Sequence, residues 1–244
     1  MRGGHGVVLA NKRPLVETFS AFQELIGSGR VRHEATVGAG LPIVYTTRYL
    51  LDTGDDIVSI SGCLSGTMGY LCASMEEGTP FSTALVEARR MGYTEPDPRE
   101  DLGGVDVARK ALILARTLGW ALEFDDVAVE PQYPPQWEQL SVQEFLQSAP
   151  QLDEAFAARV AEARARREAL RYIAEVGDGI CSVGFKSIPE HSPMGSLKST
   201  DNIVAIHSAR YERPLVISGA GAGLEVTAAG VLQDIVELAL TLGE

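Results

Sequence analysis

The stretch LRYIAEVGDGICSVGFKSI, Leu170–Ile188, holds two runs rich in β-branched and aromatic residues, LRYIAEV and GICSVGFKSI. Runs of this composition, bounded by Gly and Asp, are typical of β-strands. Two similar runs follow, NIVAIHSARY (Asn202–Tyr211) and PLVISGAG (Pro214–Gly221), and an earlier one is DIVSISGCLSG (Asp56–Gly66). Their spacing favours neighbouring strands of one open sheet, mixed or antiparallel.

Segments with helical spacing surround these runs. Two of these helical segments are joined at Gly78-Thr79-Pro80, and a long charged one directly precedes the strand run LRYIAEV. The predicted helices are YTTRYLLDTG (45–54), GTMGYLCASMEEG (66–78), PFSTALVEARRMG (80–92), VDVARKALILARTLGW (105–120) and LDEAFAARVAEARARREALR (152–171). This mixture predicts an α+β fold, an open mixed β-sheet with helices on one face.

The two ends of the chain differ in character from this centre. A short β-rich run, GVVLAN (6–11), precedes a predicted helix over 15–29, and HEATVGAGLPIV (33–44) is strand-like but broken by glycines. At the other end, a Gly-rich turn precedes a predicted helix over 225–242. These pieces look like parts of a second layer.

Composition excludes several classes of function. The 244 residues are 45% apolar and 22% charged, which is ordinary globular usage. The net charge of −12 disfavours nonspecific binding to nucleic acid or to an anionic membrane. No apolar run reaches the roughly 18 residues of a membrane span, and we expect no signal peptide. The odd number of cysteines, three and without a CxxC pair, favours a reduced, cytoplasmic setting.

The stretch GYTEPDPREDLGGVDVARK, Gly92–Lys110, carries five carboxylates and ends on a lysine. Asp106 and Lys110 are four residues apart in a predicted helix, so their side chains share a face. Alone, such a pair is most simply a helix-stabilising ion pair. Yet its surroundings are largely apolar, and Pro96 and Pro98 stiffen the loop before it. A rigid acidic loop beside a half-buried lysine can bind a substrate ammonium group and supply a proton donor.

A metal site is the competing interpretation of this loop. Asp97, Glu100, Asp101 and Asp106 could bind a hard cation, but their spacing is not that of an EF-hand loop. The four histidines are isolated from one another, which gives a zinc site or a Ser-His-Asp triad little support.

Glycines 219, 221 and 223 lie between a predicted strand and a predicted helix, in ISGAGAGLEVTAAG (217–230). A dinucleotide fingerprint has the spacing G-x-G-x-x-G and is followed by a second strand with an acidic residue. Neither condition is met here. A tight turn with close backbone packing is the favoured interpretation, and a loop that touches a cofactor from the side stays open.

Six motifs, in order, together resemble the catalytic region of homoserine dehydrogenase. They are VVLANKRPL, HEATVGAGLPI, ISGCLSGTMGYL, GYTEPDPREDLGGVDVARK, LKSTDN and PLVISGAGAGLEVTAAGVLQDI, and they span nearly the whole chain. The resemblance implies NADPH- or NADH-dependent reduction of L-aspartate 4-semialdehyde to L-homoserine, a step of threonine and methionine biosynthesis. It also implies a homodimer or higher homo-oligomer.

The resemblance assigns roles to individual residues. Lys110 matches the lysine that carries the proton to and from the substrate oxygen, and Lys12 matches a second lysine between nicotinamide and substrate. Glu95 and Asp106 match the carboxylates that hold the substrate, chiefly its amino group. The remaining pocket positions are Tyr93, Thr67 and Asp101 for the substrate, and Gly92 and Gly223 beside the cofactor.

The segment HEATVGAGL resembles a monovalent-cation loop. The Glu34 side chain and the backbone carbonyls of Val37, Ala39 and Leu41 would hold a structural sodium ion.

The resemblance also divides the chain into two parts. The family begins with a nucleotide-binding half of about a hundred residues; here residues 1–33 and 219–244 are expected to form only a remnant edge of that Rossmann-like domain. Residues 34–218 are expected to form the catalytic and dimerisation domain. The chain is therefore expected to bind nicotinamide weakly, and the alternative is a non-catalytic homologue that only dimerises or binds substrate.

Overall fold

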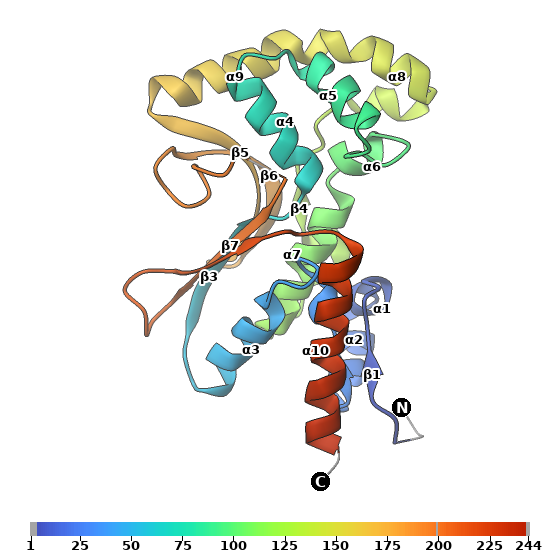
Figure 1. Cartoon of the computed structure of the whole chain (residues 1–244), viewed down its shortest axis with the longest axis vertical. Helices are drawn as coiled ribbons and strands as arrows, with labels where there is room; N and C mark the ends of the chain where they lie inside the picture. Colours follow the sequence, from blue (N-terminus) through green and yellow to red (C-terminus); the bar gives the residue numbers. More distant parts are fainter. Residues whose placement is uncertain (1–3, 199, 243–244) are drawn as a thin grey trace.

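The computed structural model describes residues 4–198 and 200–242. Among these residues, six strands form the main sheet in the order β4-β6-β5-β3-β7-β8 (Figure 1). All neighbours are antiparallel except β4 and β6, so the sheet is mixed, as predicted. The strands are β3 Ile57–Cys63, β4 Ala128–Val129, β5 Glu168–Gly177, β6 Ile180–Pro189, β7 Asn202–Ser208 and β8 Leu215–Gly219.

The stretch Leu170–Ile188 forms the hairpin at the centre of this sheet. Strands β5 and β6 pair from Glu168–Pro189 to Gly177–Ile180, and only Asp178 and Gly179 connect them. Both connecting residues have positive φ, 51° and 75°, which is the geometry that an Asp-Gly turn favours and that matches the strand twist.

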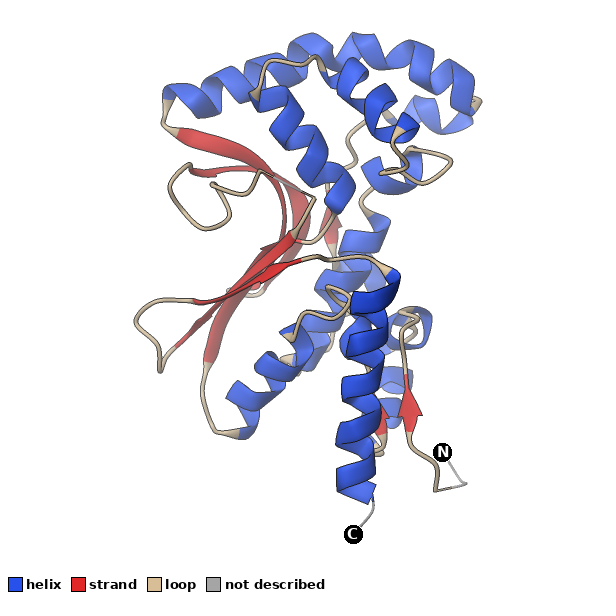
Figure 2. Cartoon of the chain, viewed as in Figure 1, coloured by secondary structure: helices blue, strands red, loops and turns tan. Residues whose placement is uncertain are grey.

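Helices cover one face of the main sheet (Figure 2). Helices α4, α7 and α9 contact β5, and their apolar side chains share one core with it. The helices are α1 Arg13–Val16, α2 Phe19–Gly27, α3 Ile43–Asp52, α4 Gly66–Glu76, α5 Phe81–Arg90, α6 Arg99–Leu102, α7 Val105–Thr117, α8 Val142–Ser148, α9 Asp153–Ala165 and α10 Leu224–Leu242, with 3-10 turns η1 Glu34–Thr36, η2 Phe124–Asp126, η3 Pro135–Gln139 and η4 Ala149–Leu152.

The two chain ends meet in a second, smaller layer. Strands β1 Val7–Val8 and β2 Val31–Arg32 pair in parallel, and α10 packs against both (Figure 1). Helix α10 also packs closely on the loop before α3, since a Cβ built on Gly40 would lie 2.1 Å from the carbonyl oxygen of Val226. The α+β architecture with an open mixed sheet is therefore confirmed, and the two ends of the chain form a separate small layer. None of the described helices is long and apolar enough to cross a membrane.

Three predicted elements are wrong in detail. Residues 33–44 form the 3-10 turn η1 and a loop instead of a strand, because the Glu34 carboxylate accepts backbone N–H groups from the first turn of α3. The predicted helix over 15–29 is two helices, since Thr18 caps a new N-terminus. The charged helix, predicted to run to residue 171, ends at Ala165. Arg167 has a positive φ, and β5 starts at Glu168.

Candidate active site

A cavity of about 610 Å³ lies where the first turns of α4 and α7 approach the acidic loop and the glycine loop that precedes α10. Its walls come from four separate segments of the chain. They are residues 64–67, the loop 92–101 with Asp106 and Lys110, residues 200–202, and residues 220–223.

Lys110 is the centre of a buried polar group in this cavity. Its side chain is 11% exposed, and Nζ lies 2.8 Å from Asp106 Oδ2 and donates to the carbonyl oxygen of Leu64 at 2.7 Å. The other oxygen of Asp106 lies 3.1 Å from Lys12 Nζ, so one carboxylate joins two lysines. An ammonium group has three N–H donors, and two of those on Lys110 are used by the protein. Among the described residues no partner takes the third N–H, which can therefore donate to a ligand.

Burial and charge act in opposite directions on this group. Burial lowers the pKa of Lys110 below its ordinary value, and Asp106 only partly offsets that effect. Burial raises the pKa of Asp106, but Lys110 and Lys12 outweigh it, so its pKa lies below the usual range. The carboxylate stays ionised while the buried lysine releases its proton more readily than a surface lysine.

The start of α7 explains why two glycines precede Asp106. Gly104 caps the helix with φ of 71°, and a Cβ there would lie 2.1 Å from the buried hydroxyl of Tyr172. Only glycine fits this conformation and this space. The α7 backbone can therefore begin against β5, and Asp106 and Lys110 face the cavity from its first two turns.

Asp101 organises the acidic loop. Its Oδ2 accepts the N–H of Glu95 at 2.8 Å, and its Oδ1 lies 2.8 Å from Thr67 Oγ1, which also lies 2.5 Å from the carbonyl oxygen of Tyr93. Burial raises the pKa of Asp101. Both of its oxygens are used inside the protein. The Glu95 carboxylate, by contrast, has no hydrogen-bond or ion-pair partner among the described residues.

The structure brings together the residues predicted for substrate and cofactor. Glu95, Asp101, Asp106, Lys110, Tyr93, Thr67, Gly92 and Gly223 line the same cavity, and Lys12 reaches it through Asp106.

Other lining residues carried no role in the sequence analysis: Ser65, Thr94, Thr200, Asp201 and Asn202. The last three belong to the motif LKSTDN. Their position at the cavity depends on how β7 packs in the sheet, so sequence spacing could not predict it.

The glycine loop before α10 is shaped by close packing. A Cβ on Gly221 would fall 2.0 Å from Cγ of Asn202, whose side chain is buried. This close approach agrees with the favoured interpretation of the motif. It brings residues 220–223 to one wall of the cavity.

The divalent-metal alternative finds no matching cluster. Over residues 4–198 and 200–242 no three His, Cys, Asp or Glu side chains gather as metal ligands. Asp97 instead binds Arg99, and Asp101 binds Thr67.

None of the four residues predicted for sodium lines this cavity; they lie in the loop between β2 and α3, whose turn η1 contacts α3 and α10. Glu34, Val37 and Ala39 are buried, and Leu41 is partly so. Glu34 accepts from the N–H groups of Val44 and Tyr45, yet burial still raises its pKa to about 7.

A buried carboxylate and backbone carbonyl oxygens are ligand types that a hard cation takes. Inside the protein, both Glu34 oxygens already accept N–H groups, and the Leu41 carbonyl accepts the N–H of Ile43. Two nearby arginines, Arg32 and Arg48, form ion pairs with Glu237. A bound cation would give the Glu34 carboxylate a positively charged partner.

Comparison with known proteins shows a clear family. The homoserine dehydrogenase family profile matches residues 42–236. A bifunctional aspartokinase/homoserine dehydrogenase 2 of Zea mays is 45% identical over 216 residues, which are 86% of this chain and 23% of that protein. The homoserine dehydrogenase of Saccharomyces cerevisiae is 37% identical, over 99% of this chain and 71% of its own length. The chain thus spans about a quarter of the maize relative.

The fold of the chain is similar to that of several solved structures. A Candida auris protein of unknown function matches with a TM-score of 0.94 and 38% identity, over 98% of this chain and 71% of its own. A mutant hyperthermophilic archaeal homoserine dehydrogenase in complex with NADPH matches with a TM-score of 0.74 and 25% identity, over 97% and 64% of the two chains.

Proposed function

Because the chain belongs to the homoserine dehydrogenase family, we propose that its cavity binds L-homoserine and L-aspartate 4-semialdehyde and serves their interconversion with NADP or NAD. The observation that carries this proposal is the joined group of Lys12, Asp106 and Lys110 next to Glu95. An amino-acid substrate needs carboxylates for its ammonium group, and an aldehyde needs a proton donor at its oxygen. Glu95, Asp106 and Lys110 offer the carboxylates and the proton donor within one cavity.

Lys110 is the proposed proton carrier. When bound, the nicotinamide would supply or accept the hydride at the substrate carbon. As the aldehyde is reduced, negative charge builds on its oxygen, and the third N–H of Lys110 stabilises that charge and donates the proton, directly or through a water. In the oxidation of homoserine, neutral Lys110 takes the hydroxyl proton. Its lowered pKa makes both protonation states accessible.

Glu95 and Asp106 are the proposed clamps for the substrate ammonium. Glu95 has no partner among the described residues, and Asp106 is 52% exposed although two lysines hold it. Holding the amino group from one side fixes the reacting carbon relative to Lys110. Thr67, Asp101 and Tyr93 keep the loop in this position.

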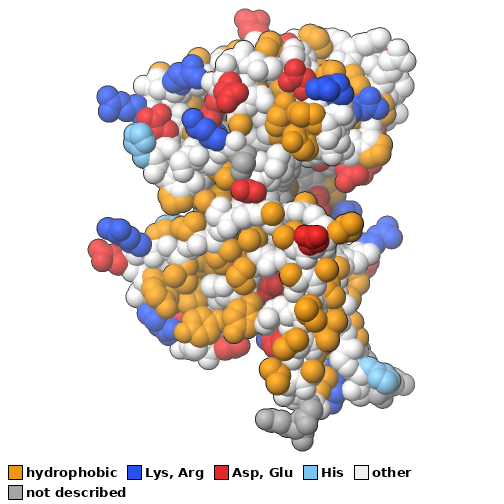
Figure 3. Space-filling view, viewed as in Figure 1, with side chains coloured by type: hydrophobic (Ala, Val, Ile, Leu, Met, Phe, Trp, Pro, Cys, Tyr) orange, Lys and Arg blue, Asp and Glu red, His pale blue; other side chains and the backbone are white. Residues whose placement is uncertain are grey.

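Gly92, Gly223 and Lys12 are the proposed neighbours of the nicotinamide. Residues 1–33 and 219–244 are the proposed edge of a nucleotide-binding domain, and residues 34–218 the catalytic and dimerisation domain. Supporting this, α10 exposes a row of apolar side chains, seen along its length in Figure 3. They are Leu224, Leu232, Ile235, Val236, Leu240 and Leu242.

Three further properties belong to the proposal. The chain forms a homodimer through its sheet, since the face away from the helices exposes Ile180 and Val216. It holds sodium with Glu34, Val37, Ala39 and Leu41. It works in the reducing cytoplasm, where its buried free thiols, Cys63, Cys72 and Cys181, stay reduced.

The test is homoserine-dependent reduction of NADP⁺, with this chain alone and joined to the nucleotide-binding segment of the yeast relative. We expect the joined protein to turn over and Lys110→Ala to lose about 10²–10⁴-fold in kcat. Lys198→Ala, which removes a lysine lining a different cavity, is the matched control. Near wild-type kcat in Lys110→Ala would rule out the proton-carrier role; binding of homoserine without turnover would favour the non-catalytic module.

A further inference from the structure

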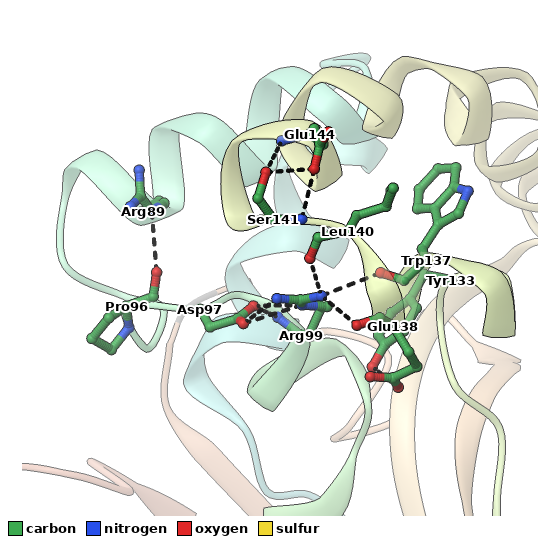
Figure 4. Close-up of polar contacts among 10 residues, drawn as sticks. All are labelled: Arg89, Pro96, Asp97, Arg99, Tyr133, Trp137, Glu138, Leu140, Ser141 and Glu144. Carbon is green, nitrogen blue, oxygen red and sulfur yellow. Dashed lines mark hydrogen bonds and ion pairs between the residues drawn. The ribbon is translucent and has the colours of Figure 1, made fainter.

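Arg99 lies at the outer side of the acidic loop and has an unusually large number of partners. Its Nε and Nη2 donate to both oxygens of Asp97, at 2.9 and 2.6 Å, in a fork-on-carboxylate arrangement. The backbone N–H of Arg99 donates to the same carboxylate at 3.0 Å. Figure 4 shows the guanidinium beside the Asp97 carboxylate, with dashed lines joining the two groups. The side chains of Arg99 and Asp97 are 15% and 28% exposed, so this ion pair is partly buried.

The third nitrogen of the guanidinium reaches a different part of the chain. Arg99 Nη1 donates to the carbonyl oxygens of Trp137, Glu138 and Leu140 at 3.2, 3.0 and 2.7 Å (Figure 4). Its Cζ lies 5.7 Å from the ring centroid of Phe145, a cation–π contact. These carbonyls terminate η3 just before α8, so Arg99 ties the acidic loop to the helical layer that covers the sheet.

The short helix α6 connects this outer contact to the cavity. Arg99 is its first residue and points outward, whereas Asp101, two residues on, points inward and holds Thr67 and the N–H of Glu95. A shift or rotation of α6 would therefore move Asp101 and Glu95 together. Loop 93–98 has further contacts at its two ends. Tyr93 contacts Thr67 and the ring of Tyr70, and the carbonyl oxygen of Pro96 accepts a long hydrogen bond of 3.4 Å from Arg89 Nε.

We propose that the Arg99–Asp97 pair, anchored on the carbonyls of residues 137–140, is a positioning device that holds Glu95 at the substrate ammonium. The inference rests on the proposed binding of homoserine. Arg99 touches no substrate; it acts through α6 and Asp101. A lysine would not replace it, because a point charge cannot bridge a carboxylate and three carbonyls at once.

The first test is amide hydrogen exchange on this chain. In Arg99→Ala and in Asp97→Ala, the amides of residues 93–95 and 97 are expected to exchange at least about tenfold faster, while those of β5 and β6 keep their rates. Arg99→Lys should resemble Arg99→Ala. The matched control is Arg166→Ala, which removes an arginine with two carboxylate partners on the surface. Unchanged exchange at residues 93–95 and 97 in both loop variants would overturn the proposal.

The second test is calorimetric titration of L-homoserine at a temperature where every variant is folded. Arg99→Ala and Asp97→Ala are expected to weaken binding about tenfold or more, with Arg166→Ala unchanged. A purely structural role would lower the melting temperature but leave the affinity of the folded protein intact, and that result overturns the positioning role. If the wild-type chain binds no homoserine, the proposed substrate is wrong, and the exchange experiment alone decides whether Arg99 orders the loop.

Discussion

At the level of single residues, the proposed chemistry depends on Lys110, whose neighbours come from three parts of the chain. Asp106 is four residues before Lys110 on α7, Leu64 precedes α4, and Lys12 precedes α1. A lysine with these neighbours has its charge balanced by one half-exposed carboxylate. Its proton affinity therefore depends directly on Asp106.

Asp106→Asn is expected to lower the pKa of Lys110 further. The negative charge of Asp106 raises that pKa while burial lowers it, so removing the charge leaves burial and the positive charge of Lys12, both of which lower it. The measurement is a ¹³C NMR titration of the lysine Cε resonances, assigned with Lys110→Arg. Asp125→Asn, in the exposed turn η2, should leave the titration unchanged. An unchanged or raised pKa in Asp106→Asn would contradict the assignment of this ion pair.

The sequence predicted part of this group and missed part of it. The i, i+4 spacing of Asp106 and Lys110 was enough to predict their pairing, because helix geometry alone brings them together. The contact with Lys12 could not be predicted from spacing, since it joins residues 94 positions apart through the packing of α1 against α7. Asp97 illustrates the same limit: its charge suggested solvent or a metal, and only the fold brings Arg99 and residues 137–140 around it.

At the scale of elements, the start of α7 positions the cavity and is sensitive to one methyl group. Gly104→Ala places a Cβ at positive φ and against the rigid, buried ring of Tyr172. We expect a loss of about 3 kcal/mol or more in the free energy of unfolding, from backbone strain and overpacking together. Urea denaturation measures it.

Gly119→Ala is the matched control for that variant. Gly119 follows the other end of α7 with φ of 88°, but a Cβ there meets nothing within 4 Å. Only the backbone strain remains, about 1 kcal/mol. Equal losses in the two variants would mean that Tyr172 does not limit the start of α7.

The loop 34–41 gives a prediction about ions. At pH 8 the Glu34 carboxylate is ionised, because its pKa of about 7 lies below that pH, and bound Na⁺ should stabilise the fold. At ten times its dissociation constant, Na⁺ should raise the melting temperature by about 3–5 °C relative to choline chloride of equal ionic strength.

At pH 5 Glu34 is protonated, so this effect of Na⁺ should largely disappear. Glu34→Gln, which keeps one acceptor for the α3 N–H groups, should remove it at pH 8. An equal response of both proteins to Na⁺ at pH 8 would show that the ion acts elsewhere.

Element types were largely predictable, and element boundaries were not. Five of the six described strands of the main sheet follow from β-branched runs and the Asp178-Gly179 turn, which act locally. Strand β4 was not predicted, because its two residues pair with β6 only through the fold. The error at residues 33–44 has a tertiary cause: strand-like composition was overridden by the contact of Glu34 with α3 and by the close packing of Gly40 on α10.

At the scale of the whole molecule, two apolar surfaces are open and should differ in function. The sheet face with Ile180 and Val216 is the proposed dimer interface, whereas the exposed face of α10 is the proposed contact with a nucleotide-binding domain. The double variant Ile180→Glu/Val216→Glu is expected to halve the mass seen by sedimentation equilibrium. Leu224→Glu, which alters a side chain that is 92% exposed on α10, should remain a dimer. A wild-type monomer, or a double variant that stays dimeric, would refute the sheet interface.

Glu95 and Asp106 are proposed to recognise an amino acid through its ammonium group, next to Lys110 as the proton carrier. The most direct measurement is calorimetric titration of this chain with L-homoserine and with 4-hydroxybutyrate, which lacks the ammonium. We predict that homoserine binds at least about tenfold more tightly, and that Glu95→Gln reduces this preference, since charge-assisted hydrogen bonds are among the strongest polar contacts. Equal affinity for the two compounds, or no binding of homoserine, would contradict the account.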